Sequence, residues 1–167
     1  MNGDSVIKYK MDWIKTYPMA ASNLTDLKKW RQILYKLKLI GVNEEGISYG
    51  NLSRRFNNQE FIITGSQTGS ISQVTEYHFT RVVDYDIEAN YLKCEGPIKA
   101  SSESLTHAII YQTLPQVNGI IHVHSKEIWE KLLYKVPTTP KNIEYMCFGI
   151  AAIRTVMCEF GYGVAFR

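Results

Sequence analysis

Hydrophobic positions change their spacing along the chain, and each spacing predicts a different element. After Tyr17 and Pro18 they recur at intervals of three and four, which predicts a helix with one apolar face. These positions are Leu27, Trp30, Ile33, Leu34 and Leu37. Thr25 is placed to cap this helix, and Gly41 to end it. The segment before Tyr17 mixes aromatic and charged residues, and we expect a short helix or arm there.

Downstream, short apolar runs and alternating positions are typical of β-strands. The predicted strands lie around Ile47 and Leu52 and at residues 61–64, 77–84, 91–94 and 163–166. Further helices are predicted at residues 102–114, 128–134 and about 143–157. Pro115 ends the first of these, because helices stop before a proline. This mixture predicts an α/β protein with a sheet covered by helices.

The run Gly119-Ile-Ile-His-Val-His-Ser125 predicts a buried strand that carries two imidazoles. Side chains alternate along a strand, so His122 and His124 share one face while Ile121 and Val123 share the other. Two imidazoles on one face can bind a single metal ion such as zinc. The alternative is that both are hydrogen-bonded strand histidines.

Composition restricts the classes of protein. A chain of 167 residues with 45% hydrophobic residues predicts a single domain, residues 1–167. The net charge of +3, without a run of Lys or Arg, argues against a nucleic-acid partner. Three cysteines at unrelated spacings predict neither a disulfide framework nor a thiolate zinc site. Without a signal pattern or an apolar span, we expect a cytoplasmic protein and no membrane partner.

Three short polar clusters accompany the histidines. They are Gly50-Asn51-Leu52-Ser53, Thr64-Gly65-Ser66 and Ser101-Ser102-Glu103. After the strand at 61–64, backbone N–H groups and a hydroxyl are expected to converge on an anion. At the start of the helix at 102–114, a serine can cap the helix and Glu103 lies in the first turn. Each cluster by itself is usually only a turn or a helix start.

Taken in order, the clusters and the His-x-His strand resemble the class II aldolase/adducin family. The resemblance runs from about Leu27 to the end of the sequence. It implies a three-layer α/β/α fold with a central, mostly antiparallel or mixed sheet. It also implies a homo-oligomer, usually a tetramer, with the active site near the subunit boundaries.

The resemblance also implies a role for each matching residue. His122 and His124 would bind a divalent metal, usually zinc, and Glu103 would be the general acid/base beside it. Six residues would surround a substrate phosphate. They are Asn51, Ser53, Thr64, Gly65, Ser101 and Ser102. His107 follows Glu103 by one helical turn, and we expect a structural role for it.

One family element has no counterpart here. Family enzymes carry a third metal-binding histidine late in the chain, whereas no histidine follows His124. The sequence is therefore expected to be a truncated or a naturally incomplete version. A further ligand from Glu103, from His78 or from a neighbouring subunit is left open, since catalytic zinc sites generally have three protein ligands.

These expectations favour a metal-dependent lyase that cleaves a small phosphorylated sugar by retro-aldol chemistry. Two alternatives stay open at this stage. One is a sugar-phosphate dehydratase, which would use the same metal and a similar acid/base. The other is a non-catalytic, adducin-like binding or scaffold domain, which the missing histidine favours.

Overall fold

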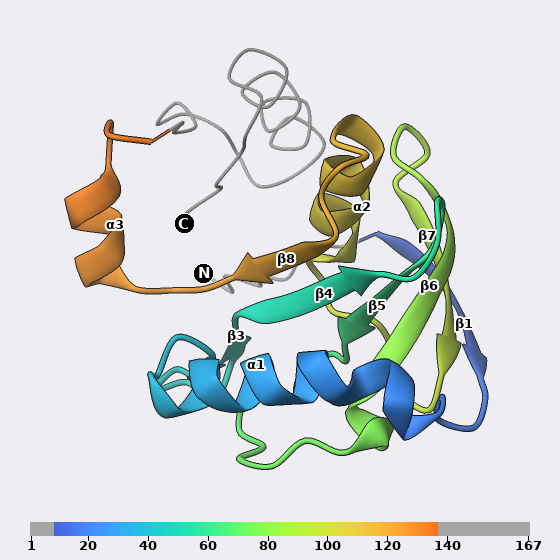
Figure 1. The fold of residues 1–167 in the computed structure, drawn as a ribbon, viewed down its shortest axis with the longest axis horizontal. Helices are drawn as coiled ribbons and strands as arrows, with labels where there is room; N and C mark the ends of the chain where they lie inside the picture. Colours follow the sequence, from blue (N-terminus) through green and yellow to red (C-terminus); the bar gives the residue numbers. More distant parts are fainter. Residues whose placement is uncertain (1–8, 137–167) are drawn as a thin grey trace.

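A six-stranded sheet forms the centre of the computed structural model, which describes residues 9–136 (Figure 1). Its strands lie in the order β1-β7-β6-β5-β4-β8. They are β1 (Lys10–Lys15), β4 (Asn51–Arg55), β5 (Phe61–Thr64), β6 (Phe79–Asp86), β7 (Tyr91–Gly96) and β8 (Gly119–His122). Strands β1 and β7 pair in parallel, and all other neighbours are antiparallel. A separate ribbon pairs β2 (Gly41–Val42) with β3 (Ser48–Tyr49).

Helices cover both faces of this sheet. Helix α1 (Thr25–Lys36) packs on one face and α2 (Ser104–Thr113) on the other, while α3 (Lys126–Leu132) follows β8 (Figure 1). Two short 3-10 turns, η1 (Ala21–Leu24) and η2 (Glu76–His78), precede α1 and β6. The three-layer α/β/α arrangement with a mixed, mostly antiparallel sheet is therefore confirmed.

The apolar run of β5 explains why helices can pack on both faces. Ile62 joins the core cluster under α1, which includes Leu27, whereas Ile63 joins the cluster under α2, which includes Leu105. Because successive side chains point to opposite faces, a strand buried on both sides must be apolar at every position. The sequence at 61–64 meets this requirement, and the strand predicted there is confirmed.

The segment before Tyr17 is a strand, so the helix or arm expected there is wrong. Tyr9, Met11 and Trp13 alternate along it and pack against the core under α2. Strand β1 pairs with β7, about 80 residues further along the chain, from Lys10 opposite Tyr91 to Lys15 opposite Gly96. This pairing, rather than a local helix, satisfies the backbone polar groups of the segment.

Helix ends also differ from the expected ones. Leu24, not Thr25, is the N-cap residue of α1, and it makes no side-chain cap. The helix stops at Lys36, with Lys38 in the left-handed region (φ 57°), and Gly41 lies in β2. Helix α2 begins at Ser104, so Glu103 is its N-cap residue instead of a first-turn residue.

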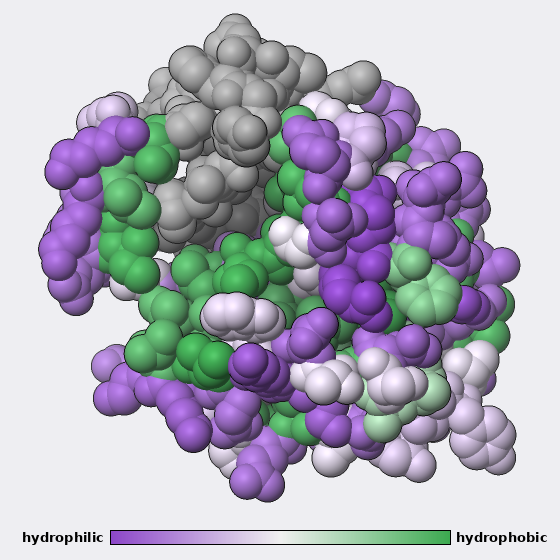
Figure 2. Space-filling view, viewed as in Figure 1, coloured by the Kyte–Doolittle hydropathy of each residue, from purple (hydrophilic) through white to green (hydrophobic). Residues whose placement is uncertain are grey.

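The strand at the histidines is not the buried strand expected. Strand β8 ends at His122 and lies at an edge of the sheet formed by the described residues. Ile121 is 49% exposed. Apolar side chains gather at the surface between β8 and α3, whose outer face is hydrophilic (Figure 2). The elements predicted at 143–157 and 163–166 lie outside the described residues. Within residues 9–136, no helix is long and apolar enough to cross a membrane.

Candidate active site

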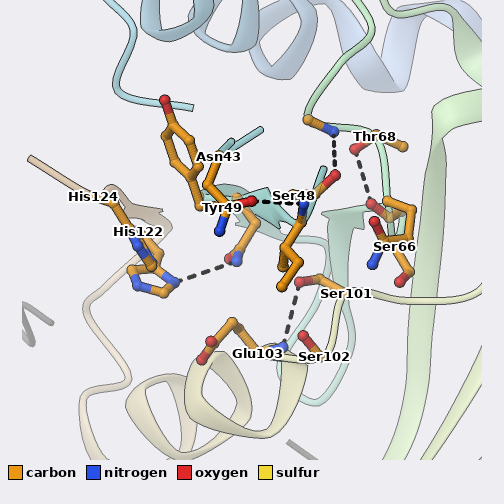
Figure 3. A pocket seen from close by; sticks show the side chains of 16 residues that line it. Asn43, Ser48, Tyr49, Ser66, Thr68, Ser101, Ser102, Glu103, His122 and His124 are labelled. Carbon is orange, nitrogen blue, oxygen red and sulfur yellow. Dashed lines mark hydrogen bonds between the residues drawn. The ribbon is translucent and has the colours of Figure 1, made fainter. Parts of the chain in front are cut away.

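A pocket of about 320 Å³ opens where the β2–β3 ribbon meets the ends of β4 and β8 and the start of α2. Figure 3 shows His122 and His124 on one side of it, Ser66 and Thr68 on the other, and Glu103 with Ser102 between. Seven of the predicted site residues line this pocket. They are Asn51, Gly65, Ser101, Ser102, Glu103, His122 and His124. Segments up to 73 residues apart thus meet at one place.

The imidazole side of the pocket is built on the pairing of β4 with β8. Asn51 lies opposite His122 in the register, and its Nδ2 is 3.3 Å from the Nδ1 of His122. The ring centres of His122 and His124 are 5.0 Å apart, with 46° between the ring planes. The other amide atom of Asn51, Oδ1, is buried and accepts no hydrogen bond from the described residues. It is therefore placed to accept one from a ligand or an ordered water.

Hydrogen bonds of Ser101 and Ser104 fix the backbone at the start of α2. The Ser101 hydroxyl accepts a hydrogen bond from the Glu103 N–H at 3.3 Å. The backbone carbonyl of Ser101 accepts a second one from the Ser104 hydroxyl at 2.6 Å. The Tyr9 hydroxyl donates to the same carbonyl at 2.9 Å, and burial raises the pKa of Tyr9, keeping it a neutral donor. These bonds hold Glu103 at the helix N-terminus, where the helix dipole favours negative charge.

The opposite side of the pocket is the turn at residues 65–69. The Gly69 N–H donates to the Ser48 hydroxyl at 3.1 Å, and the Thr68 hydroxyl donates to the Gly65 carbonyl at 2.9 Å. A Cβ at Gly69 would lie 2.0 Å from the backbone oxygen of Gly41, so only glycine fits this close approach. The turn therefore packs directly onto the β2–β3 ribbon.

Contrary to the prediction from the sequence, the backbone N–H groups of Gly65 and Ser66 are not available to an anion. The N–H groups of Gly65 and Ser66 donate to the carbonyls of His78 and Lys99, at 2.8 and 2.9 Å. They pair with neighbouring strand and loop backbone because the end of β5 continues its sheet contacts there. Of these two residues, only the Ser66 hydroxyl is left to donate to an anion in the pocket.

Arg31 supports the same turn from α1. It is 1% exposed and donates to the carbonyls of Thr68, Gly69 and Ile71 at 2.9, 3.4 and 3.1 Å. Burial lowers the pKa of Arg31, which makes no ion pair with the described residues. A buried guanidinium thus stabilises the wall of the pocket from behind.

Ser53 and Thr64 do not line the pocket, although they were expected beside the phosphate. The Ser53 hydroxyl lies 2.7 Å from both the Nδ1 of His107 and the hydroxyl of Tyr111, under α2. The Thr64 hydroxyl accepts from the Leu52 N–H at 3.3 Å. The Thr64 hydroxyl therefore bonds within the sheet, and the Ser53 hydroxyl bonds between the sheet and α2. His107 is fully buried there, in agreement with the structural role expected for it.

Burial, followed by the charge of the nearby His122, lowers the pKa of His107 to about 3. The ring is therefore neutral at pH 7, with its Nδ1 facing Ser53. Its Nε2 is buried and has no hydrogen-bond partner among the described residues.

Comparison with known proteins agrees with this arrangement. The family model for the Class II Aldolase and Adducin N-terminal domain matches residues 38–135, which contain every residue of the pocket. This chain belongs to the class II aldolase and adducin family.

Two solved structures of similar fold add to this match. An L-fuculose 1-phosphate aldolase is 21% identical, with a TM-score of 0.57 over 84% of this chain and 69% of its own. The Escherichia coli protein YgbL, described as a candidate aldolase, epimerase or decarboxylase, is 14% identical. Its TM-score is 0.50 over 74% of this chain and 55% of its own. At these identities the two structures support the fold alone.

Class II aldolases generally use a divalent metal, and the described residues fit such an ion in part. Two imidazoles that bind one zinc through nitrogens at tetrahedral angles have ring centres roughly 5 Å apart. His122 and His124 match that spacing at 5.0 Å. The Asn51 Nδ2 donates to the Nδ1 of His122, whereas a ring that binds zinc through Nε2 donates its Nδ1–H, so the amide would then present Oδ1 to the ring instead. Among residues 9–136, no three side chains of His, Cys, Asp or Glu lie close enough together to bind one metal ion.

Several residues that line this pocket were not predicted. They are Asn43, Ile47, Ser48, Tyr49, Gly50, Ser66, Gln67, Thr68 and Gly69. Ser66 and Gly50 had a signal, since each belongs to a polar cluster singled out in the sequence. The others had none, because the contact that brings the β2–β3 ribbon and the turn at 65–69 together joins segments about 20 residues apart.

Proposed function

We propose that this protein is a metal-dependent lyase that cleaves a carbon–carbon bond of a small phosphorylated sugar by retro-aldol chemistry. One observation carries the proposal: Glu103, His122 and His124 line a single pocket in a class II aldolase fold. A carboxylate beside two imidazoles combines a proton carrier with ligands for a Lewis acid. The pocket volume of about 320 Å³ suits a small substrate.

His122 and His124 are the residues that would hold the metal, most commonly zinc. When bound, a divalent ion stabilises negative charge on the oxygens of a hydroxy-ketone as a Lewis acid. Asn51 orients the His122 ring through its contact with Nδ1.

Glu103 would move the proton that the reaction requires. In cleavage, the hydroxyl on the carbon that becomes the aldehyde loses its proton, and the neighbouring carbon–carbon bond breaks. The electron pair of that bond forms an enediolate, which then takes up a proton at carbon. Glu103 is the pocket carboxylate for this transfer, held at the start of α2 by Ser101.

A phosphate would lie at the hydroxyl side of the pocket. Ser66, Ser101 and Ser102 present hydroxyls there and Asn51 an amide, while the N-terminus of α2 adds a favourable dipole. The name of the structurally similar L-fuculose 1-phosphate aldolase supports a phosphorylated sugar. Binding this remote group would position the reacting carbons. We further propose that the protein assembles as a homo-oligomer, most simply a tetramer.

The test is a turnover screen of phosphorylated four- to six-carbon ketoses with added divalent metal, with aldehyde release as the signal. Glu103→Gln is expected to lower turnover at least ~100-fold, since a general acid/base contributes about 10²–10⁴-fold. Glu88→Gln, at an exposed turn, is the matched control and keeps full turnover. Full activity of Glu103→Gln would refute the assigned role. Formation of a dehydrated sugar phosphate without release of an aldehyde would identify the dehydratase alternative.

A further inference from the structure

The ring of His124 is stacked against Tyr49. His124 lies two residues beyond the end of β8, where the strand ladder no longer fixes its conformation. Its N–H donates to the Leu39 carbonyl at 3.4 Å, a long hydrogen bond. The ring centres of Tyr49 and His124 are 5.5 Å apart with 29° between the planes. Both residues line the pocket (Figure 3).

Tyr49 is itself held at both ends. Its backbone lies in β3, opposite Gly41 in β2, and its hydroxyl donates to the Lys38 carbonyl at 3.3 Å. A Cβ at Gly41 would lie 2.8 Å from that hydroxyl, so the absence of a side chain there makes room for the phenol. The tyrosine ring is thus a fixed surface against which the imidazole packs.

We propose that Tyr49 is a positioning residue that sets the orientation of the His124 imidazole and thereby raises the affinity of the site for a divalent ion. The inference rests on the proposed function insofar as it treats His124 as a metal ligand. A ring already held in one orientation loses less conformational freedom when it binds an ion. The Tyr49 face offers no donor or acceptor that competes for the imidazole nitrogens.

Cobalt(II) titration of the metal-free full chain measures the effect on affinity. Tyr49→Leu removes the aromatic face and is expected to raise the dissociation constant for Co²⁺ about 10-fold, as the loss of an orienting neighbour does. Tyr49→Phe keeps the ring and is expected to stay within about 2-fold of the wild type. Tyr17→Leu removes a tyrosine that is 92% exposed and serves as the control for general effects.

A second readout needs no metal. The ring protons of His124 are expected to show a ring-current shift in NMR spectra from the stacked phenol. The shift persists in Tyr49→Phe and disappears in Tyr49→Leu. Gly41→Ala displaces the phenol without removing it, and is expected to alter the shift as well.

These two readouts separate failure of the inference from failure of the proposed function. Wild-type Co²⁺ affinity in Tyr49→Leu would overturn the inference while leaving the metal site intact. An unchanged His124 shift in Tyr49→Leu would overturn it independently of any metal. Absence of Co²⁺ binding in the wild type would overturn the proposed function and the affinity effect. The effect of Tyr49 on the orientation of His124 would then be tested by the ring-current shift of the His124 protons in the metal-free protein.

Discussion

Asn51 and His122 face each other across β4 and β8, with the Asn51 amide 3.3 Å from the Nδ1 of His122. This contact joins one of the polar clusters in the sequence to the His-x-His segment, 71 residues away. Because both residues occupy paired strand positions, the backbone register itself fixes the contact. The imidazole therefore reaches the pocket in one preferred orientation.

Removal of this amide is expected to weaken metal binding. Asn51→Ala takes away the amide whose oxygen, turned toward the ring, would accept the Nδ1–H of a His122 that binds zinc through Nε2, and we expect the zinc dissociation constant to rise about 10- to 100-fold. Isothermal titration of the metal-free protein measures the change. Asn118→Ala removes an exposed amide that donates to the nearby Gln116 carbonyl, and it should bind zinc like the wild type. Equal affinities for both variants would contradict the orienting role of Asn51.

The buried, neutral His107 predicts a loss of stability in weak acid. Burial, and next the charge of His122, lowers the pKa of His107 to about 3, whereas the unfolded side chain titrates near 6.5. Between these values the unfolded chain binds a proton that the folded chain does not, so the free energy of unfolding falls as pH falls. This one group contributes a loss of about 2 kcal/mol between pH 6.5 and pH 5.

Urea denaturation at several pH values measures this slope. His107→Gln keeps a polar partner for Ser53 and removes the titration. The variant is expected to be less stable at pH 7 but to lose less stability on acidification. Parallel stability curves for the wild type and the variant between pH 6.5 and pH 5 would refute the assignment.

Arg31 is expected to be important for the turn at residues 65–69. Arg31→Met leaves three carbonyls, those of Thr68, Gly69 and Ile71, without their donor. We expect the free energy of unfolding to fall by about 2–3 kcal/mol, since unsatisfied buried acceptors cost ~1–3 kcal/mol each and partial relaxation offsets part of the sum. Exchange of the Gly69 amide hydrogen should accelerate as well, because that N–H bonds to Ser48 within the same wall.

Arg54→Met is the matched control for this substitution. Arg54 is half-buried and, among residues 9–136, donates to one carbonyl, that of Asn23, at 2.8 Å. A loss of at most about 1.5 kcal/mol is expected for one such bond. If thermal and chemical denaturation show the same loss for both arginines, the turn does not depend on Arg31 in the way described.

Local patterns predicted those elements whose burial is visible in a few consecutive residues. The apolar run at 61–64 is β5, and the spacing of Leu27 and Leu34 identifies α1. Strand β1 was missed because its partner β7 lies about 80 residues away. The alternation of Tyr9, Met11 and Trp13 is the signal that would have found it.

In the site, too, features visible in a few consecutive residues were predicted, and those that depend on distant partners were not. The clusters around Asn51, Gly65 and Glu103 were recognised as motifs, and the fold brings them together with both histidines. Tyr49 and Arg31 were not recognised, because a stacking partner and a buried donor to turn carbonyls have no local signature. Ser53 belongs to a recognised motif, but its hydroxyl bonds to His107 because it lies beneath α2 rather than at the pocket.

Metal content of the full chain, measured by elemental analysis after purification without chelator and reconstitution with zinc, tests the central claim most directly. We predict about one ion per chain for the wild type, with loss of that ion when both His122 and His124 are replaced by alanine. No bound ion in the wild type, or the same content in the double variant, would contradict a metal site at these histidines.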